Sequence, residues 1–147
     1  MLIYDLTILA TGMVAGFMLS YCVTLGHYYN FLLKTHRDKG FSDYYSVFRR
    51  QENISKRYAL CIGSQFVVSL LAVLFAQGHA SLTALLPLPF LLLCHRLTGF
   101  GKAEETIVSG QSFDERQRQL YLRWNIPLHL TYSLVYACAC LCLLFYR

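Results

Sequence analysis

The residues best placed to do chemistry lie near the start of the last apolar stretch of the chain. Asn125 and His129 are four residues apart, so a helix would place both on one face. Arg123 and Trp124 precede them by one turn or less. If the membrane begins near Leu120, a rise of ~1.5 Å per residue puts His129 at a depth of about 13 Å. An ionisable side chain at that depth is costly in lipid and predicts a functional site.

Two more histidines are expected at the same level of the membrane. His95 ends the third apolar stretch and His27 follows the first, so the topology argued below brings them to the side where His129 enters. Two of these three histidines could ligate a b-type haem. The sequence itself specifies no cofactor and no metal.

An enzyme would use these side chains in different roles. His129 would act as a base or metal ligand, and Asn125 would orient a substrate or dioxygen. Arg96 or Arg123 would hold a developing anion. The alternative is structural: the histidines and arginines reach the headgroups, and Asn125 and His129 form hydrogen bonds between helices.

The composition predicts the elements that carry these residues. Of 147 residues, 56% are apolar and 14% charged, against roughly 25% charged in a soluble domain. This excludes a soluble enzyme, a disulfide-rich secreted module and a nucleic-acid-binding domain. The chain instead predicts a single integral membrane domain, an all-α bundle of four transmembrane helices. The expected spans are 6–25, 58–76, 80–97 and 120–146, with a tight connection around Gln77, Gly78 and His79 joining the second and third.

The basic residues predict the orientation of the bundle. Seven of the 13 lie in segment 27–57 and five near the entrance of the last span, which leaves only Arg147 on the other side. The positive-inside rule therefore predicts a cytoplasmic (inner) membrane with both termini on the non-cytoplasmic side.

Segment 27–57 interleaves aromatic with basic residues. This pattern favours an interfacial helical segment lying on the bilayer, which we expect to hinge near Gly40. A docking surface for a partner subunit is the alternative.

Helix ends and kinks are marked by short motifs. Ser112 and Glu115 predict a capping box that starts the last helix. Pro87, Pro89 and Pro127 predict bends within the third and fourth spans.

Small residues recur along the first span. Gly12, Gly16 and Ser20 form a stripe that favours close helix packing, either within the bundle or with a membrane-protein partner or second copy of the chain. The six cysteines show no metal-binding or redox spacing and are expected to pack as small apolar side chains.

The order of these parts resembles the anthrone-oxygenase-like family of small four-span membrane proteins. The matching stretches are GMVAGFMLSY in the first span and LYLRWNIPLHL at the last. The resemblance implies a membrane bundle and, for some members, cofactor-independent oxygenation of polyketide anthrones. It carries over Trp124 and Asn125 as site positions, whereas the prolines of the third span depart from it.

Three functions follow as hypotheses. The first is an accessory or structural subunit that acts through helix association, supported by the small-residue stripe and by the lack of a complete catalytic motif. The second is a membrane-embedded oxygenase or redox enzyme that acts on a hydrophobic substrate. The third is a carrier of lipids or hydrophobic small molecules.

Overall fold

The computed structural model describes residues 2–75 and 79–146, and for residues 38–42 and 79 it describes the backbone alone. All regular structure in these ranges is helical, and four helical segments are long and apolar enough to cross a membrane. They are Leu2–Lys34, Ile54–Phe75, Ala80–Thr98 and Glu115–Phe145. The all-α bundle of four spans is therefore confirmed.

The first span is longer than expected. Helix α1 (Leu2–Tyr21) continues through a π-helical turn, η1 (Cys22–Gly26), into α2 (His27–Lys34), so it ends nine residues beyond the predicted Leu25. Gly26 lies where this segment passes close to Ile126: a Cβ at Gly26 would lie 2.7 Å from Ile126 Cδ1. Glycine thus allows this segment to approach α7 (Glu115–Phe145) closely.

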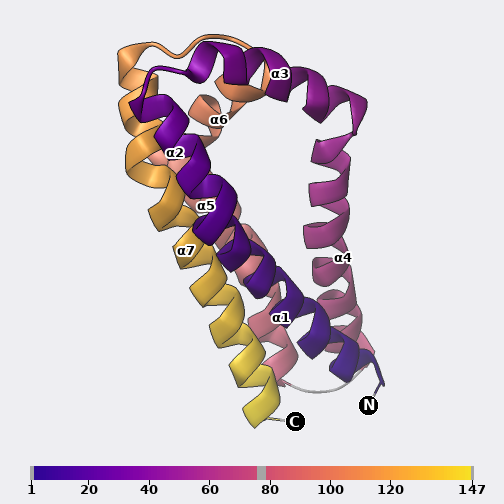
Figure 1. Ribbon diagram of the computed structural model, residues 1–147. Coiled ribbons are helices and arrows are strands. Elements are labelled where there is room, and N and C mark those ends of the chain that lie inside the picture. Colours follow the sequence, from indigo (N-terminus) through magenta and orange to yellow (C-terminus); the bar gives the residue numbers. More distant parts are fainter. Residues whose placement is uncertain (1, 76–78, 147) are drawn as a thin grey trace.

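The segment between the first two spans is helical, but its hinge is not at Gly40. Helix α3 (Asp38–Gln51) includes Gly40, and the chain turns instead at His36, whose φ is +54°. Figure 1 shows α3 lying across the top of the bundle and leading into α4 (Ile54–Phe75). The left-handed backbone at His36 thus makes the change of direction that was predicted at Gly40.

The third span is divided by its prolines. A 3₁₀ helix, η2 (His79–Leu85), precedes α5 (Pro87–Thr98), and Pro87 occupies the first turn of α5. At the predicted bend the chain therefore changes from a 3₁₀ helix to an α-helix. Because Pro87 lies in the first turn of α5, where backbone amides have no partner within the helix, the amide that proline lacks is not needed. Most of the predicted tight connection before it, residues 76–78, lies outside the described residues.

The last helix begins with a different capping box from the predicted one. Asp114 is the N-cap: its side chain accepts a hydrogen bond from the Gln117 amide at 2.7 Å, and its own amide donates to Gln117 Oε1 at 3.2 Å. The Ser112 and Glu115 prediction was wrong because the reciprocal pair starts two residues later.

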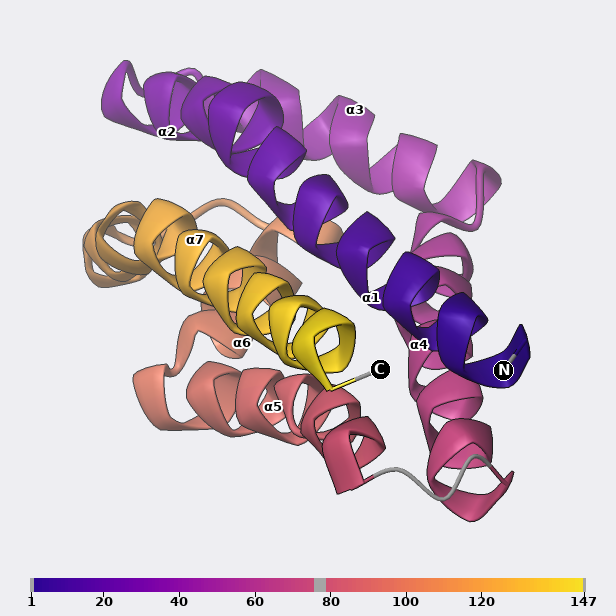
Figure 2. The same ribbon diagram turned by 90° about the horizontal axis from the view of Figure 1, so that it is seen from below.

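The helices form a splayed bundle. Seen from below, α7 lies between α1 and α5, and α4 lies on the other side of α1 (Figure 2). Away from α3, buried Gln65 of α4 joins the helices: its Nε2 lies 3.1 Å from Thr11 Oγ1 and 3.0 Å from the Ala84 carbonyl oxygen. At the other end, α3 keeps α4 apart from α7 (Figure 1).

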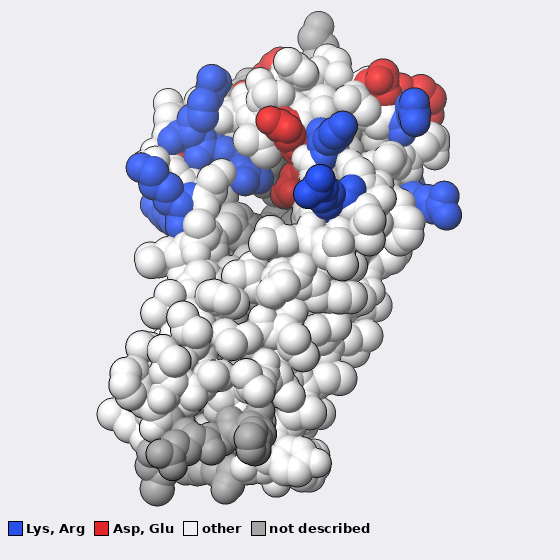
Figure 3. Space-filling view, turned by 180° about the vertical axis from the view of Figure 1, so that it is seen from behind, with Lys and Arg blue, Asp and Glu red and all other residues white. Residues whose placement is uncertain are grey.

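Charged side chains gather at the end of the molecule that carries α3 and α6 (Phe100–Val108), as Figure 3 shows. We call this the charged end. Below it the visible surface is uncharged over the length of the spans, which is the pattern expected of a protein whose middle lies in lipid.

Candidate functional site

A cavity of about 240 Å³ lies between the splayed helices near the charged end. Every long helix lines it, and so do the short helices α2, α3 and α6. Aromatic residues dominate the lining, including six tyrosines: Tyr21, Tyr29, Tyr45, Tyr58, Tyr121 and Tyr132. Four residues that can carry charge also face it: Arg49, His95, Glu104 and His129. An apolar cavity with a few convergent polar groups is the usual form of a small-molecule site.

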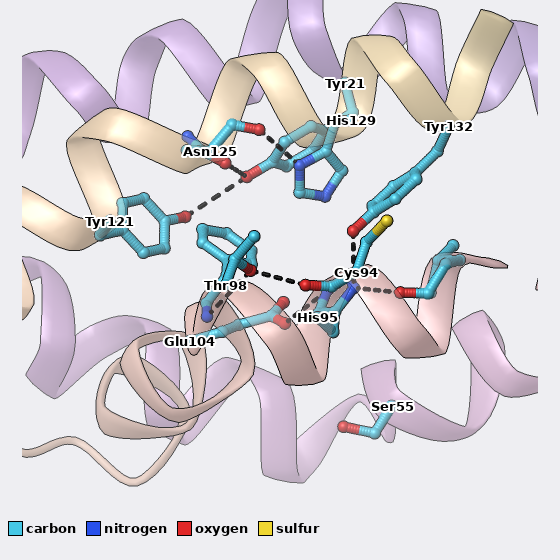
Figure 4. A network of polar contacts seen from close by, with 12 residues as sticks. Tyr21, Ser55, Cys94, His95, Thr98, Glu104, Tyr121, Asn125, His129 and Tyr132 are labelled. Atoms are coloured by element: carbon cyan, nitrogen blue, oxygen red, sulfur yellow. Dashed lines mark hydrogen bonds and ion pairs between the residues drawn. The ribbon is translucent and has the colours of Figure 1, made fainter. Parts of the chain in front are cut away.

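His129 is the ionisable side chain that α7 contributes to the cavity. Its Nδ1 lies 2.7 Å from the backbone carbonyl oxygen of Asn125, one turn earlier. Because a carbonyl oxygen only accepts, Nδ1 carries the proton in the neutral ring and Nε2 keeps a lone pair. The imidazole packs against Tyr21 with 4.2 Å between ring centroids. Figure 4 shows it between Tyr21 and Tyr132, facing the space toward α5.

Asn125 holds three segments together behind His129. Its side chain is fully buried, and Oδ1 accepts from the Tyr21 hydroxyl at 2.8 Å. Its Nδ2 donates to the Gly26 carbonyl oxygen at 3.0 Å and to Asn30 Oδ1 at 2.9 Å. Both amide hydrogens are thus used within the protein, and the side chain is absent from the cavity lining. Asn125 positions Tyr21 and His129, and the predicted role of orienting a substrate does not fit this geometry.

A second polar group lies across the cavity, on α5, α6 and α7. His95 Nδ1 is 2.9 Å from the Tyr132 hydroxyl and 3.1 Å from the Leu91 carbonyl oxygen. On the other side of the ring, Nε2 lies 3.8 Å from Glu104 Oε2. The stacked rings of His95 and Tyr132, with centroids 5.4 Å apart, fix this orientation.

Arg49 places a cation at the same wall. Its Nη1 lies 3.9 Å from Glu104 Oε1, and its Nη2 donates to Ser55 Oγ at 3.1 Å. The Arg49 side chain is only 12% exposed. A guanidinium held this way, beside a carboxylate and an imidazole, can stabilise negative charge that develops on a bound molecule.

Gly99 brings Glu104 over the cavity. It ends α5 in the left-handed conformation, with φ of +69°, and is followed directly by α6. The chain therefore reverses within one residue and returns α6 toward α5 and α7. Without this reversal, Glu104 would continue away from the bundle.

The structure brings together some of the predicted site residues and separates others. His95 and His129 both line the cavity, whereas His27 is exposed and absent from its lining. His27 therefore does not join His95 and His129 in the cavity, and it lies on the outer face where α2 begins. Arg96 is also exposed.

The two residues before Asn125 also lie outside the cavity. Arg123 is exposed, and its guanidinium lies 5.3 Å from the ring centroid of Trp124. Trp124 packs against the hydrophobic core and does not line the cavity. Neither residue contacts the predicted site, so their predicted catalytic roles are not supported by the geometry.

The sequence missed Arg49, Glu104 and the tyrosines. The sequence places Arg49 among the basic residues of segment 27–57 and gives no reason to single out Glu104, and tyrosines are common at membrane interfaces. The signals that could have revealed them are Gly99 after the third span, typical of a left-handed helix end, and the tyrosines of segment 27–57.

The lining does not fit a haem. His27 cannot contribute a ligand to the cavity. The cavity volume of about 240 Å³ is below the roughly 300–1,000 Å³ of sites for drug-sized ligands. Haem is larger than such ligands, so it does not fit this space. Among the described residues, no group of three or more His, Cys, Asp and Glu side chains could hold a metal ion.

The small-residue stripe is also divided. A Cβ at Gly12 would lie 3.4 Å from Cys140 Sγ, so this position packs against α7 within the bundle. Gly16 and Ser20 are exposed, and no described atom lies within 4 Å of a Cβ built at Gly16.

Comparison with known proteins adds no relative: no family model, no curated protein and no solved structure matches this chain. The resemblance to the anthrone-oxygenase-like family therefore stays a prediction.

Proposed function

We propose that this protein binds a small apolar molecule with a weakly acidic hydroxyl or enol group, and that His129 accepts the proton of that group. The observation that carries the proposal is the His129 ring, whose Nδ1 is engaged by the Asn125 carbonyl and whose other nitrogen is left for a ligand. A neutral imidazole that lines a cavity is a suitable general base.

The opposite wall supports the same proposal. Loss of a proton leaves the bound molecule with negative charge, and Arg49 lies among the residues that would face it. Tyr121 and Tyr132 also line the cavity and add polar hydroxyl groups to it. Binding alone would suit a carrier of hydrophobic molecules, whereas proton transfer belongs to the oxygenase or redox enzyme that the resemblance implies.

The proposal is tested with 4-nitrophenol, whose phenolate form has its own absorption band. The purified protein in lipid nanodiscs is titrated with this probe, with empty nanodiscs as the reference for partitioning into lipid. Saturable binding and a bound phenolate band are expected. In His129→Gln the ratio of phenolate to phenol in the bound probe should fall by about tenfold, which corresponds to about 1.4 kcal/mol.

His27→Gln is the matched control, because His27 is exposed and outside the cavity. It should leave both the affinity and the phenolate band as in the wild type. Absence of saturable binding, or equal phenolate bands in His129→Gln and the wild type, would contradict the proposal.

A second candidate function, association with another membrane protein or a second copy, rests on the exposed backbone at Gly16. In a mild detergent, Gly16→Leu should then dissociate a complex that survives Gly63→Leu, since Gly63 on α4 is also open around its Cβ position. If the wild type is a monomer in that detergent and in native membranes, this function is excluded.

For either function we place the protein in a cytoplasmic membrane with the charged end inside. The support is the gathering of basic side chains at one end of the bundle (Figure 3).

A further inference from the structure

A second hollow, of about 300 Å³, adjoins the cavity on the side of α1, η1 and α4, beneath α3. We call it the lateral groove. The residues that line it and not the cavity are Leu25, Phe48, Ile54, Arg57 and Cys61. Leu25 in the first span and Phe48 in α3 are 46% and 47% exposed, so the groove opens on the outer surface where the first span meets α3.

Aromatic side chains form the boundary between the two hollows. Phe17, Tyr29, Tyr45 and Tyr58 line both. They lie in two pairs: the rings of Phe17 and Tyr58 have centroids 5.4 Å apart, and those of Tyr29 and Tyr45 are 5.3 Å apart. The two hollows therefore share a boundary made of these four aromatic residues.

The two hollows differ in chemistry. The cavity holds Arg49, Glu104 and the two histidines, whereas the lateral groove is apolar except at Arg57 and the tyrosines. Arg57 belongs to the first turn of α4 and is paired with Glu52 at 2.8 Å, which places its charge at the rim of the groove nearest the charged end. The cavity, which contains the charged groups, thus adjoins an apolar groove that opens on the outer surface of the bundle.

We infer that the cavity and the lateral groove are two parts of one site, which takes a single-tailed amphiphile from the bilayer. Its acidic head lies in the cavity and its apolar tail lies in the lateral groove. This inference rests on the proposed function, because it assigns the head to the cavity that contains His129. Moving a tail from lipid into the groove gains little, since lipid is as apolar as the groove lining. Selectivity therefore comes from the head, and the groove provides the room that the tail needs.

The test compares two probes, 4-nitrophenol and a 4-nitrophenol with a dodecyl chain attached to its ring. The affinity of each probe for the protein is measured in nanodiscs. The ratio of the dodecyl probe's affinity to that of 4-nitrophenol shows whether the protein has room for the tail. The groove is blocked by the double variant Leu25→Trp/Phe48→Trp and, independently, by Ile54→Trp on the facing helix. The matched control is Val23→Trp/Val47→Trp, which also introduces two tryptophans, on the same two elements but at exposed positions outside both hollows.

Both blocking variants should lower the affinity for the dodecyl probe relative to 4-nitrophenol by at least about tenfold, while the control keeps the wild-type ratio. If a blocking variant that binds 4-nitrophenol keeps that ratio, or if the wild type binds 4-nitrophenol and not the dodecyl probe, the groove does not hold the tail. Those results would leave the proposed function in place. If the wild type binds neither probe, the proposed function fails, and this inference fails with it.

Discussion

At the level of single residues, Asn125 and His129 have separate roles although they share one helix face. The Asn125 side chain is used completely by Tyr21, Gly26 and Asn30, so it contributes to the site by holding α1, α2 and α7 in place. Its backbone carbonyl fixes the His129 ring. Substitutions of Asn125 are therefore expected to change the stability of the protein and the position of the His129 ring. Substitutions of His129 are expected to remove the group that accepts a proton from the ligand.

Replacement of Asn125 with leucine should lower the free energy of unfolding by about 1–3 kcal/mol, because the buried Gly26 carbonyl and Asn30 side chain lose their donor. Reversible unfolding in mixed detergent micelles measures this change. Gln119→Leu, an exposed position on the same helix, should have little effect. Equal stabilities of the two variants would show that the Asn125 network is not formed.

Much of the α7 side of the site can be read from the sequence, because spacing on one helix determines a shared face. Asn125 and His129 were found in this way. Arg96 and Arg123 lie outside the cavity because each residue of a helix turns by about 100°: Arg96 directly follows His95, and Arg123 lies two residues before Asn125, so both point elsewhere. Arg49 and Glu104 depend on the turns at His36 and Gly99, whose direction a single sequence does not define.

At the level of elements, the junction of α5 and α6 determines the charged wall of the cavity. Gly99 adopts a left-handed conformation that a residue with a Cβ takes at a cost of roughly 1–2 kcal/mol. Space is not the constraint, since the nearest atom to a Cβ there would be Leu120 Cδ1 at 3.8 Å. The backbone conformation at this turn is what favours glycine.

Gly99→Ala should therefore destabilise the protein by about 1 kcal/mol or more and weaken 4-nitrophenol binding as Glu104 is displaced. Gly101→Ala is the control within α6, where a Cβ would meet ordinary contacts of 3.9 Å or longer and alanine favours the helix. It should be neutral or stabilising in thermal unfolding. A Gly99→Ala protein as stable as Gly101→Ala would contradict the role of this turn.

The spans themselves were predictable because length and hydropathy determine them, and all four are present. The errors lie at element ends. Ser112 and Asp114 are both good N-caps, and only the reciprocal Gln117 contact decides between them. The hinge at His36 was missed because a non-glycine residue adopts the positive φ.

At the level of the whole molecule, the splay of the bundle creates the cavity. Gln65 joins α4 to α1 and η2 away from the charged end, and α3 spans the gap where the helices diverge. A bundle packed evenly along its length would leave no such space. The orientation in the membrane then decides which leaflet the lateral groove meets.

The positive-inside rule predicts that residues 109–114 lie in the cytoplasm and the end of α7 outside. In a variant with all six cysteines replaced by serine, Ser112→Cys and Phe145→Cys give one exposed thiol each. A membrane-impermeant maleimide added to intact cells should label Phe145→Cys and not Ser112→Cys until the membrane is opened. The reverse pattern would place the charged end outside.

The central claim is that a weakly acidic apolar molecule binds beside His129, and photolabelling with 4-azidophenol tests its location most directly. After irradiation of the protein in nanodiscs, mass spectrometry of the peptides should find adducts on the cavity lining of α5 and α7, around His95, Tyr121 and Tyr132, and excess 4-nitrophenol should suppress them. Adducts spread over lipid-facing positions such as Leu60 and Leu134, unaffected by 4-nitrophenol, would contradict the claim.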